Sequence, residues 1–282
     1  MTQLIIDAGS TKTEWIVLKD GGVESRFTTT GFNPNYSDYT VLLDLLHKAL
    51  PKDLPPMDSV HYYGSGCGSD VNREEVAHYL RVRFDEAKEV SVTHDLMAVC
   101  HAVCGDEKGI ACILGTGANS CLYDGKEITD QAVSLGYLVG DEGSGCYIGK
   151  KVVRAYFYDL MPLELKLSFK ECYHLEIKDL IHNVYHQQGA SKYLAQFARF
   201  AGDHLDHPFI RQLVKACFDD FIQVFVLRYK DCHSLPVSFV GSVAFYFQEL
   251  LKECLAAERL TLGKVCQTPA EGLVAYYRDR SW

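Results

Sequence analysis

The sequence predicts an α/β protein of two domains, for three reasons. Strand-like and helix-like segments alternate through the first hundred residues, which is typical of α/β folds. A strand, a tight bend and a second strand open the chain, and the same arrangement returns from residue 109, which indicates a weak internal duplication. The length of 282 residues is sufficient for two medium-sized domains.

Composition and charge exclude several classes of protein. The chain is 48% hydrophobic and 23% charged, as in ordinary globular proteins. Its net charge of -9 and the absence of a Lys/Arg-rich run argue against binding to nucleic acid or to an anionic membrane. No apolar stretch reaches the roughly 18 residues of a membrane span, and no signal-peptide pattern opens the chain. We expect a cytoplasmic protein that binds neither nucleic acid nor membrane.

The eleven cysteines are odd in number and irregular in spacing. Cys100 and Cys104 form the closest pair, and their spacing is not the Cys-x-x-Cys of a zinc or redox site. We expect the cysteines to be small buried hydrophobic side chains in a reducing compartment, with metal or cluster ligation as the alternative. The cysteines that lie singly in apolar or glycine-rich surroundings are Cys67, Cys112, Cys121, Cys146, Cys217 and Cys254.

The first part of the chain predicts three antiparallel strands followed by alternating strands and helices. Apolar, β-rich runs mark the strands, an Asp-Gly turn separates the second strand from the third, and Ser37 is a candidate N-cap for the first helix. In order, the expected elements are strands at 3–9, 12–19 and 23–31, a helix at 38–51, a strand from 59, a helix at 72–84, a strand at 88–95 and a helix from 96 to 105.

The second part repeats the opening arrangement and then becomes mostly helical. Residues 109–125 read as strand, Gly-Thr bend, strand and Asp-Gly turn. A glycine-rich stretch follows at 135–149, and the region from 150 to 230 is mostly helical in pattern. Residues 234–255 indicate a strand, a glycine turn and a helix, and a short helix ends the chain from 270.

The two bends are suited to binding phosphate. A bend between strands presents backbone N–H groups, and small residues let an anion come close. Asp7 stands just before the first bend, where it can hold the hydration shell of Mg²⁺. Neither bend is a Walker P-loop or a Rossmann fingerprint, because each leads into a strand rather than a helix. Either bend alone is equally compatible with a plain hairpin.

Six segments, in order along the chain, resemble one superfamily. The chain is similar over nearly its whole length to the sugar kinase, heat-shock chaperone and actin ATPases, and within them to N-acetylglucosamine kinases and BadF/BadG/BcrA/BcrD-type ATPases. The most specific stretch is 135–149, which is close to a Gly-Asp-Glu-Gly-Ser signature. The six segments are DAGSTKTEW (7–15), THDLMAV (93–99), ILGTGANSCLYDG (113–125), LGYLVGDEGSGCYIG (135–149), FVGSVA (239–244) and PAEGLVAY (269–276).

This resemblance implies a fold and a set of ligands. It implies two ribonuclease H-like (actin-like ATPase) domains with an interdomain cleft, an N-terminal domain at 1–105 and a C-terminal domain at 106–282. The terminal helix is expected to pack back on the N-terminal domain. ATP and Mg²⁺ are the expected cofactors, a small sugar is the expected substrate, and a homodimer is the expected assembly.

The resemblance also implies roles for particular residues. Asp95 would be the base that accepts the proton of the sugar hydroxyl, although the same residue could simply cap the following helix. Asp7 would bind Mg²⁺ through water. The phosphate-binding residues would be Ser10, Thr11, Lys12, Thr13, Gly115, Thr116 and Gly117; Gly241 and Ser242 would lie under the adenine ribose; and Asn33, Ser65, Asp95, Gly136 and Asp141 would bind the sugar.

The expected function is ATP-dependent phosphorylation of an amino sugar at the 6-hydroxyl, with N-acetylglucosamine as the first candidate. Ala8 stands where the family usually has glycine, and the loop at 64–69 departs from the usual sugar loop. These departures leave N-acetylmuramate, glucosamine or an anhydro-sugar open as substrates. Two other functions within the superfamily are an ATPase activator that shares an iron–sulphur cluster between subunits, and a regulator that binds nucleotide or sugar without turnover.

Overall fold

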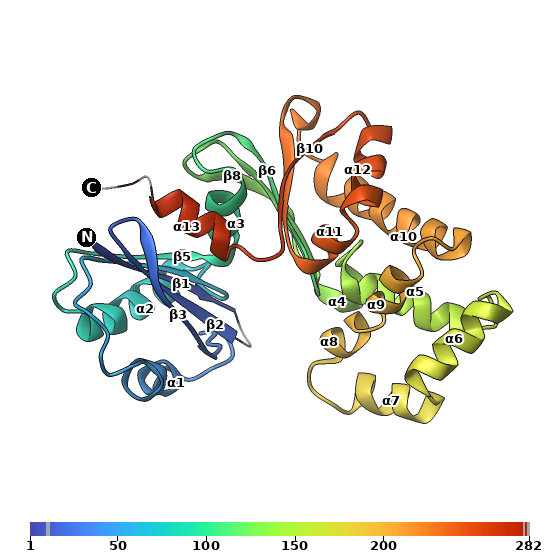
Figure 1. Cartoon of the computed structure of the whole chain (residues 1–282), viewed down its shortest axis with the longest axis horizontal. Coiled ribbons are helices and arrows are strands. Elements are labelled where there is room, and N and C mark those ends of the chain that lie inside the picture. Colours follow the sequence, from blue (N-terminus) through green and yellow to red (C-terminus); the bar gives the residue numbers. More distant parts are fainter. Residues whose placement is uncertain (10–11, 279, 281–282) are drawn as a thin grey trace. The chain divides into compact units, whose positions relative to one another are not determined.

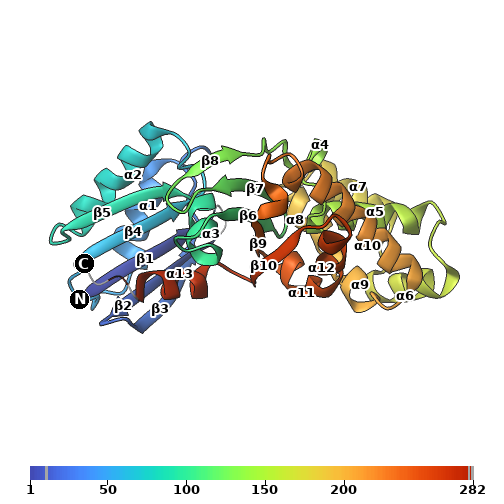
Figure 2. The same ribbon diagram turned by 90° about the horizontal axis from the view of Figure 1, so that it is seen from above.

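The computed structural model describes residues 1–9, 12–278 and 280, and it divides into two compact units (Figure 1). Unit 1 comprises residues 1–106 and 268–282, and unit 2 comprises residues 107–267. Each unit contains one five-stranded mixed sheet with helices packed on it (Figure 2). The fold is therefore α/β, as predicted.

In unit 1 the strand order is β3-β2-β1-β4-β5. The first three strands are antiparallel, and β4 and β5 run parallel to β1. The carboxyl ends of β1, β4 and β5 therefore share one edge of the sheet, where Ala8, Gly64 and His94 are in register. The strands are β1 (Thr2–Ala8), β2 (Lys12–Lys19), β3 (Gly22–Thr30), β4 (Ser59–Gly64) and β5 (Glu89–His94).

The two faces of this sheet pack against different helices, because successive side chains of a strand point to opposite faces. One face, which includes Trp15 and Tyr62, forms a core with α1 (Tyr39–Asp44), the π-helical turn η1 (Leu45–Ala49) and α2 (Asp70–Arg83). The other face packs against α3 (Asp95–Val103) and against the terminal helix α13 (Ala270–Arg278), which lies on α3 (Figure 1).

The helix starts correct one prediction. The N-cap of α1 is Asp38 and not Ser37, because the Asp38 carboxylate accepts a hydrogen bond of 2.8 Å from the backbone N–H of Thr40. An Asx side chain at this position satisfies one of the unpaired N–H groups of the first turn. The sequence offers both residues as caps, and the chain uses the one with the carboxylate.

Unit 2 repeats the sheet of unit 1, with the strand order β10-β9-β6-β7-β8. Here too three antiparallel strands are followed by two strands parallel to the first. The sequence pattern did not predict β8 or β10. The strands are β6 (Gly109–Leu114), β7 (Ala118–Tyr123), β8 (Ile128–Gln131), β9 (Pro236–Val240) and β10 (Thr261–Cys266).

The helices of unit 2 enclose a large core rich in aromatic side chains, among them Phe169, Phe200 and Phe221. Most of these helices lie between β8 and β9 in the sequence, in the region predicted to be helical. They are α4 (Gly136–Val139), α5 (Gly145–Phe157), α6 (Leu163–Tyr173), α7 (Ile177–Tyr185), α8 (Ala190–Ala195), α9 (Ala198–Asp203), α10 (Pro208–Phe221), η2 (Ile222–Val226), η3 (Cys232–Ser234), α11 (Ser242–Tyr246) and α12 (Gln248–Ala257).

The six cysteines that were singled out from the sequence are all buried. This confirms that they are small core side chains. Cys100 is also buried, whereas Cys104 is partly exposed. Within residues 1–9, 12–278 and 280, no helix is both long enough and apolar enough to span a membrane.

Candidate active site

Asp95 lies at the carboxyl edge of the sheet in unit 1. Strand β5 ends at His94, and Asp95 is the first residue of α3. The hydroxyl of Ser65, just beyond β4, donates a hydrogen bond of 3.0 Å to Oδ2 of Asp95. The backbone N–H of Ser65 donates to the carbonyl of Ala8 at 2.8 Å. Ser65 therefore connects the end of β1 to the carboxylate of Asp95.

Asp95 is not the N-cap of α3. The N-cap position belongs to His94, whose side chain makes no capping hydrogen bond. Asp95 stands one position later, in the first turn, where the helix dipole favours a negative charge. The cap interpretation of Asp95 is therefore wrong, and its carboxylate is instead held by Ser65.

Asp7 lies in a crowded negative environment. It faces Glu14 directly across the antiparallel pair β1–β2, an arrangement in which like charges repel. Burial, Glu14 and Asp95, in that order, raise the pKa of Asp7 to about 7, and Lys12 opposes them. The ionised group is therefore destabilised at neutral pH, and a bound cation would relieve it. This donor set fits a divalent cation.

The described residues hold no group of three or more His, Cys, Asp or Glu side chains arranged for a metal ion. That finding is compatible with Mg²⁺, which usually keeps several waters and binds through one or two carboxylates together with substrate phosphates. Asp7, with Glu14 beside it, meets this requirement. Glu14 was missed from the sequence, because the strand pattern alone does not fix the hairpin register that places it opposite Asp7.

Asn33 lies against the loop that follows Ser65. Its side-chain oxygen accepts a 3.0 Å hydrogen bond from the backbone N–H of Asn35. A Cβ added to Gly66 would lie 2.2 Å from this oxygen, and Gly66 has φ of +84°, so only glycine fits there. The structure thus brings Asn33, Ser65 and Asp95, three predicted sugar-binding residues, to one edge of unit 1.

The first bend is only partly described, because Ser10 and Thr11 lie outside the described residues. On either side of them, the N–H of Gly9 donates to the carbonyl of Lys12 at 2.9 Å. Lys12 is exposed on the same face as Glu14 and Asp7, where a phosphate can reach it. Thr13 is buried on the opposite face, and its hydroxyl has no hydrogen-bond partner.

In unit 2 the second bend, Gly115 to Gly117, joins β6 to β7. Gly115 N–H donates to the carbonyl of Gly117 at 3.0 Å. The first N–H groups of α5 donate to the bend in turn, Gly145 to the carbonyl of Gly115 at 2.7 Å and Cys146 to that of Thr116 at 3.1 Å. The bend is therefore fixed to the start of a long, well-packed helix.

Asp141 lies against this bend. A Cβ added to Gly117 would lie 2.9 Å from Oδ2 of Asp141, and the backbone N–H of Ala118 donates to the same carboxylate. Burial raises the pKa of Asp141, while Ala118 and Lys150 oppose the shift. Lys150 also donates to the carbonyl of Tyr137 at 2.5 Å. It thereby connects Asp141 to the segment that begins at Gly136.

Gly241 and Ser242 lie beside the second bend. A Cβ added to Gly115 would be 3.9 Å from the Cα of Gly241, at the carboxyl end of β9. Ser242 is the first residue of α11. Thus the second bend, Asp141 and the predicted adenosine turn form one group of residues in unit 2.

We expect Gly241→Ala to lower the free energy of unfolding by about 3 kcal/mol or more. Gly241 has φ of +139°, and a Cβ there would lie 2.3 Å from the carbonyl oxygen of Leu114. Gly115→Ala is the matched control, because its Cβ would meet only ordinary van der Waals contact. Urea unfolding of both variants checks the prediction, and equal midpoints would contradict it.

Comparison with known proteins connects this geometry to a family. A search against protein-family models and a search of curated proteins each found no match. Among solved structures, the chain matches the "Putative N-acetylglucosamine Kinase" from Porphyromonas gingivalis at 39% identity, with 98% of this chain and 99% of that chain covered and a TM-score of 0.91. The chain belongs to the N-acetylglucosamine kinase family of sugar kinases.

More distant structures show that the fold of this kinase family member is the actin-like ATPase fold of sugar kinases. The "Putative N-acetylglucosamine Kinase" from Chromobacterium violaceum matches at 16% identity, over 98% of both chains, with a TM-score of 0.72. A ROK family glucokinase from Streptomyces griseus, solved with glucose and AMPPNP, matches at 14% identity, over 98% of both chains, with a TM-score of 0.53. The narrower likeness to BadF-type ATPases stays a prediction.

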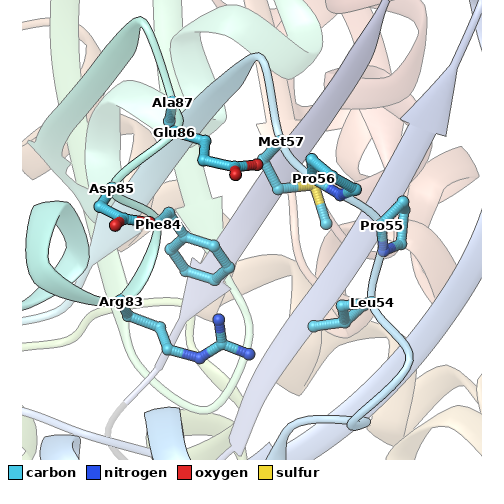
Figure 3. Close-up of a pocket in the computed structure, with 9 residues that line it drawn as sticks. All are labelled: Leu54, Pro55, Pro56, Met57, Arg83, Phe84, Asp85, Glu86 and Ala87. Carbon is cyan, nitrogen blue, oxygen red and sulfur yellow. The ribbon is translucent and has the colours of Figure 1, made fainter.

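A pocket in unit 1 of this sugar kinase lies away from Ser65 and Asp95. Segments 54–57 and 83–87 line it, ahead of β4 and β5, at the opposite ends of these strands from Ser65 and Asp95 (Figure 3). Its volume of about 180 Å³ is below the roughly 300 Å³ at which ligand pockets usually begin. Arg83 is already engaged there, donating to the carbonyl of Leu46 at 3.0 Å. The pocket is therefore not the substrate site.

Proposed function

We propose that the chain transfers the γ-phosphoryl group of ATP to the 6-hydroxyl of an amino sugar, with N-acetylglucosamine as the substrate. The observation that most supports this proposal is the arrangement around Asp95. The Asp95 carboxylate at the sheet edge accepts from Ser65, the residue after Ser65 approaches Asn33, and Asp95 is close enough to Asp7 to raise the pKa of Asp7. A base, polar groups for a sugar and a cation ligand are thus close together.

In the proposed reaction Asp95 orients the sugar hydroxyl and accepts its proton. The hydroxyl oxygen forms a bond to the γ-phosphorus, the bond to the oxygen shared with the β-phosphate breaks, and ADP leaves. Such a transfer depends mainly on positioning and on neutralising charge. Mg²⁺, when bound, would supply charge neutralisation at the phosphates. Lys12 and the backbone of Gly115 to Gly117 would hold the phosphates, and the turn at Gly241 the ribose.

The choice of N-acetylglucosamine follows the name of the 39% identical relative from Porphyromonas gingivalis. Asp141 and Asn33 supply a carboxylate and an amide, groups that hydrogen-bond to sugar hydroxyls and to an acetamido group. Both side chains are buried. A site of this kind distinguishes hexosamines more strongly by their polar substituents than by their size.

ADP release with a panel of sugars tests the proposal. The purified protein is given ATP and Mg²⁺ with N-acetylglucosamine, N-acetylmuramate, glucosamine, N-acetylmannosamine, glucose or no sugar. We expect ADP to form with N-acetylglucosamine in a one-to-one ratio to a 6-phosphate seen by phosphorus NMR. Equal ATP hydrolysis with and without sugar would instead indicate an activator. ATP binding without turnover would indicate a regulator.

A further inference from the structure

Helix α3 is hydrogen-bonded near both of its ends, once to β4 and once to the residue that follows β4. Tyr63 lies in β4, and Ser65 follows just after the end of this strand. Ser65 binds Asp95, the first residue of α3, at 3.0 Å, and the Tyr63 hydroxyl binds Nδ1 of His101, in the last turn, at 2.6 Å. Helix α3 therefore has a second attachment, about two turns from Asp95.

That second attachment includes the terminal helix. The Tyr63 hydroxyl is also 2.6 Å from the hydroxyl of Tyr277 on α13, and both tyrosines are buried. The ring of Tyr276 stacks on His101, with 4.2 Å between ring centroids and 9° between ring planes. The ring of Tyr277 stacks on His61 of β4 at 4.3 Å. Two consecutive residues of α13 thus contact α3 and β4.

The backbones of α3 and α13 are also in close contact. A Cβ added to Gly272 would lie 2.4 Å from the carbonyl oxygen of Ala102, so only glycine permits this approach. Beyond the helix, the guanidinium of Arg280 lies 3.8 Å from the ring centroid of Tyr276 and forms an ion pair with Asp106. Gly272, Tyr276 and Arg280 thereby hold α3 near its C-terminal end.

We propose that α13 is a positioning element for Asp95, and that it acts through the hydroxyl of Tyr63. The role of Asp95 in this inference rests on the proposed function. The chain leaves unit 1 after Asp106, just past α3, and returns at Thr268, just before α13. Both connections between the units therefore arise at this helix pair, so a displacement of either one acts on the helix that begins with Asp95.

Packing alone does not account for the polar part of this contact. Phenylalanine in place of Tyr63 would fill the same space and would avoid the cost of burying a hydroxyl. The hydroxyl instead joins His101 to Tyr277, and a fully paired buried network favours a single arrangement of the elements it connects. Whichever atoms donate, removing the Tyr63 hydroxyl breaks both hydrogen bonds at once.

Tyr63→Phe tests the proposal, with Tyr62→Phe as the matched control. Tyr62 is the preceding residue of β4, faces the opposite core, and has a buried hydroxyl with no hydrogen-bond partner. We expect Tyr63→Phe to lower kcat for sugar phosphorylation about tenfold, because the loss of both hydrogen bonds leaves Asp95 less firmly oriented. The KM values for ATP and sugar should stay within about twofold of wild type, and Tyr62→Phe should behave as wild type.

Amide hydrogen exchange supplies a readout that does not need activity. In Tyr63→Phe, and not in Tyr62→Phe, the amides of 95–103 should exchange about tenfold faster, while those of β1 stay unchanged. Faster exchange without a change in kcat would overturn the proposal, as would an unchanged exchange rate. If the wild type phosphorylates no sugar, the proposed function fails. The exchange result then still decides whether α13 holds α3 through Tyr63.

Discussion

Replacing Asp95 by Asn is expected to lower kcat for sugar phosphorylation by about 10²- to 10⁴-fold, the usual effect of removing a general base. Asn keeps the size of the side chain and can still accept from Ser65 through its amide oxygen. It cannot take up the proton of the attacking hydroxyl. The fold should therefore persist while the chemical step slows, with the KM for ATP close to that of the wild type.

Asp85→Asn is the matched control for this prediction. Asp85 precedes β5 and lines the small pocket (Figure 3). Asp95 follows the same strand. Both substitutions remove one carboxylate from one end of β5. The measurement is ADP release at saturating ATP and sugar, with thermal melting to verify folding. If Asp95→Asn keeps more than about a tenth of the wild-type kcat, Asp95 is not the base.

Much of the site could be predicted because it depends on strand ends. The turns that follow β1, β4, β5, β6 and β9 are visible in the sequence as small or polar residues after apolar runs. Parallel strands then bring their carboxyl ends to one edge, as Ser65 and Asp95 show. Ser65 and Asp95, 30 positions apart, were assigned together from the family resemblance, and the topology of the sheet explains why they lie together.

Other features could not be predicted because they depend on register or on tertiary contact. Glu14 faces Asp7 only in one hairpin register, which the pattern of the strand does not show by itself. Short edge strands such as β8 and β10 have weak patterns of their own and form by pairing with their neighbours. The contact of Tyr63 with Tyr277 joins residues 214 positions apart, and no local signal marks it.

Asp7→Asn is expected to stabilise the protein above pH 7 by up to about 4 kcal/mol, and to abolish sugar phosphorylation. Burial and the facing Glu14 raise the pKa of Asp7 from 3.8 to about 7. When folding raises the pKa of a carboxyl group, the stability of the fold is greatest below the pKa of the unfolded state and is lost as pH rises through the pKa of the folded state. Asn resembles the protonated form, so the variant avoids this loss.

The gain should therefore disappear near pH 4 and reach its full size above about pH 7, as urea unfolding between pH 4 and 8.5 would show. Glu14→Gln should stabilise less, because Glu14 is the second cause of the shift after burial. Asp53→Asn, at an exposed carboxylate, should follow the wild type at every pH. If the unfolding free energies of wild type and Asp7→Asn changed in parallel with pH, the prediction would be contradicted.

Mg²⁺ with a non-hydrolysable ATP analogue should reverse the order of stability. A cation that binds near Asp7 pairs with the ionised carboxylate, so the ligand should raise the melting temperature of the wild type more than that of Asp7→Asn. A protein that retains two facing carboxylates at a cost to its own stability gains by it only when a positive charge binds there. The instability of Asp7 in the free chain is thus the strongest physical reason to place the cation at this residue.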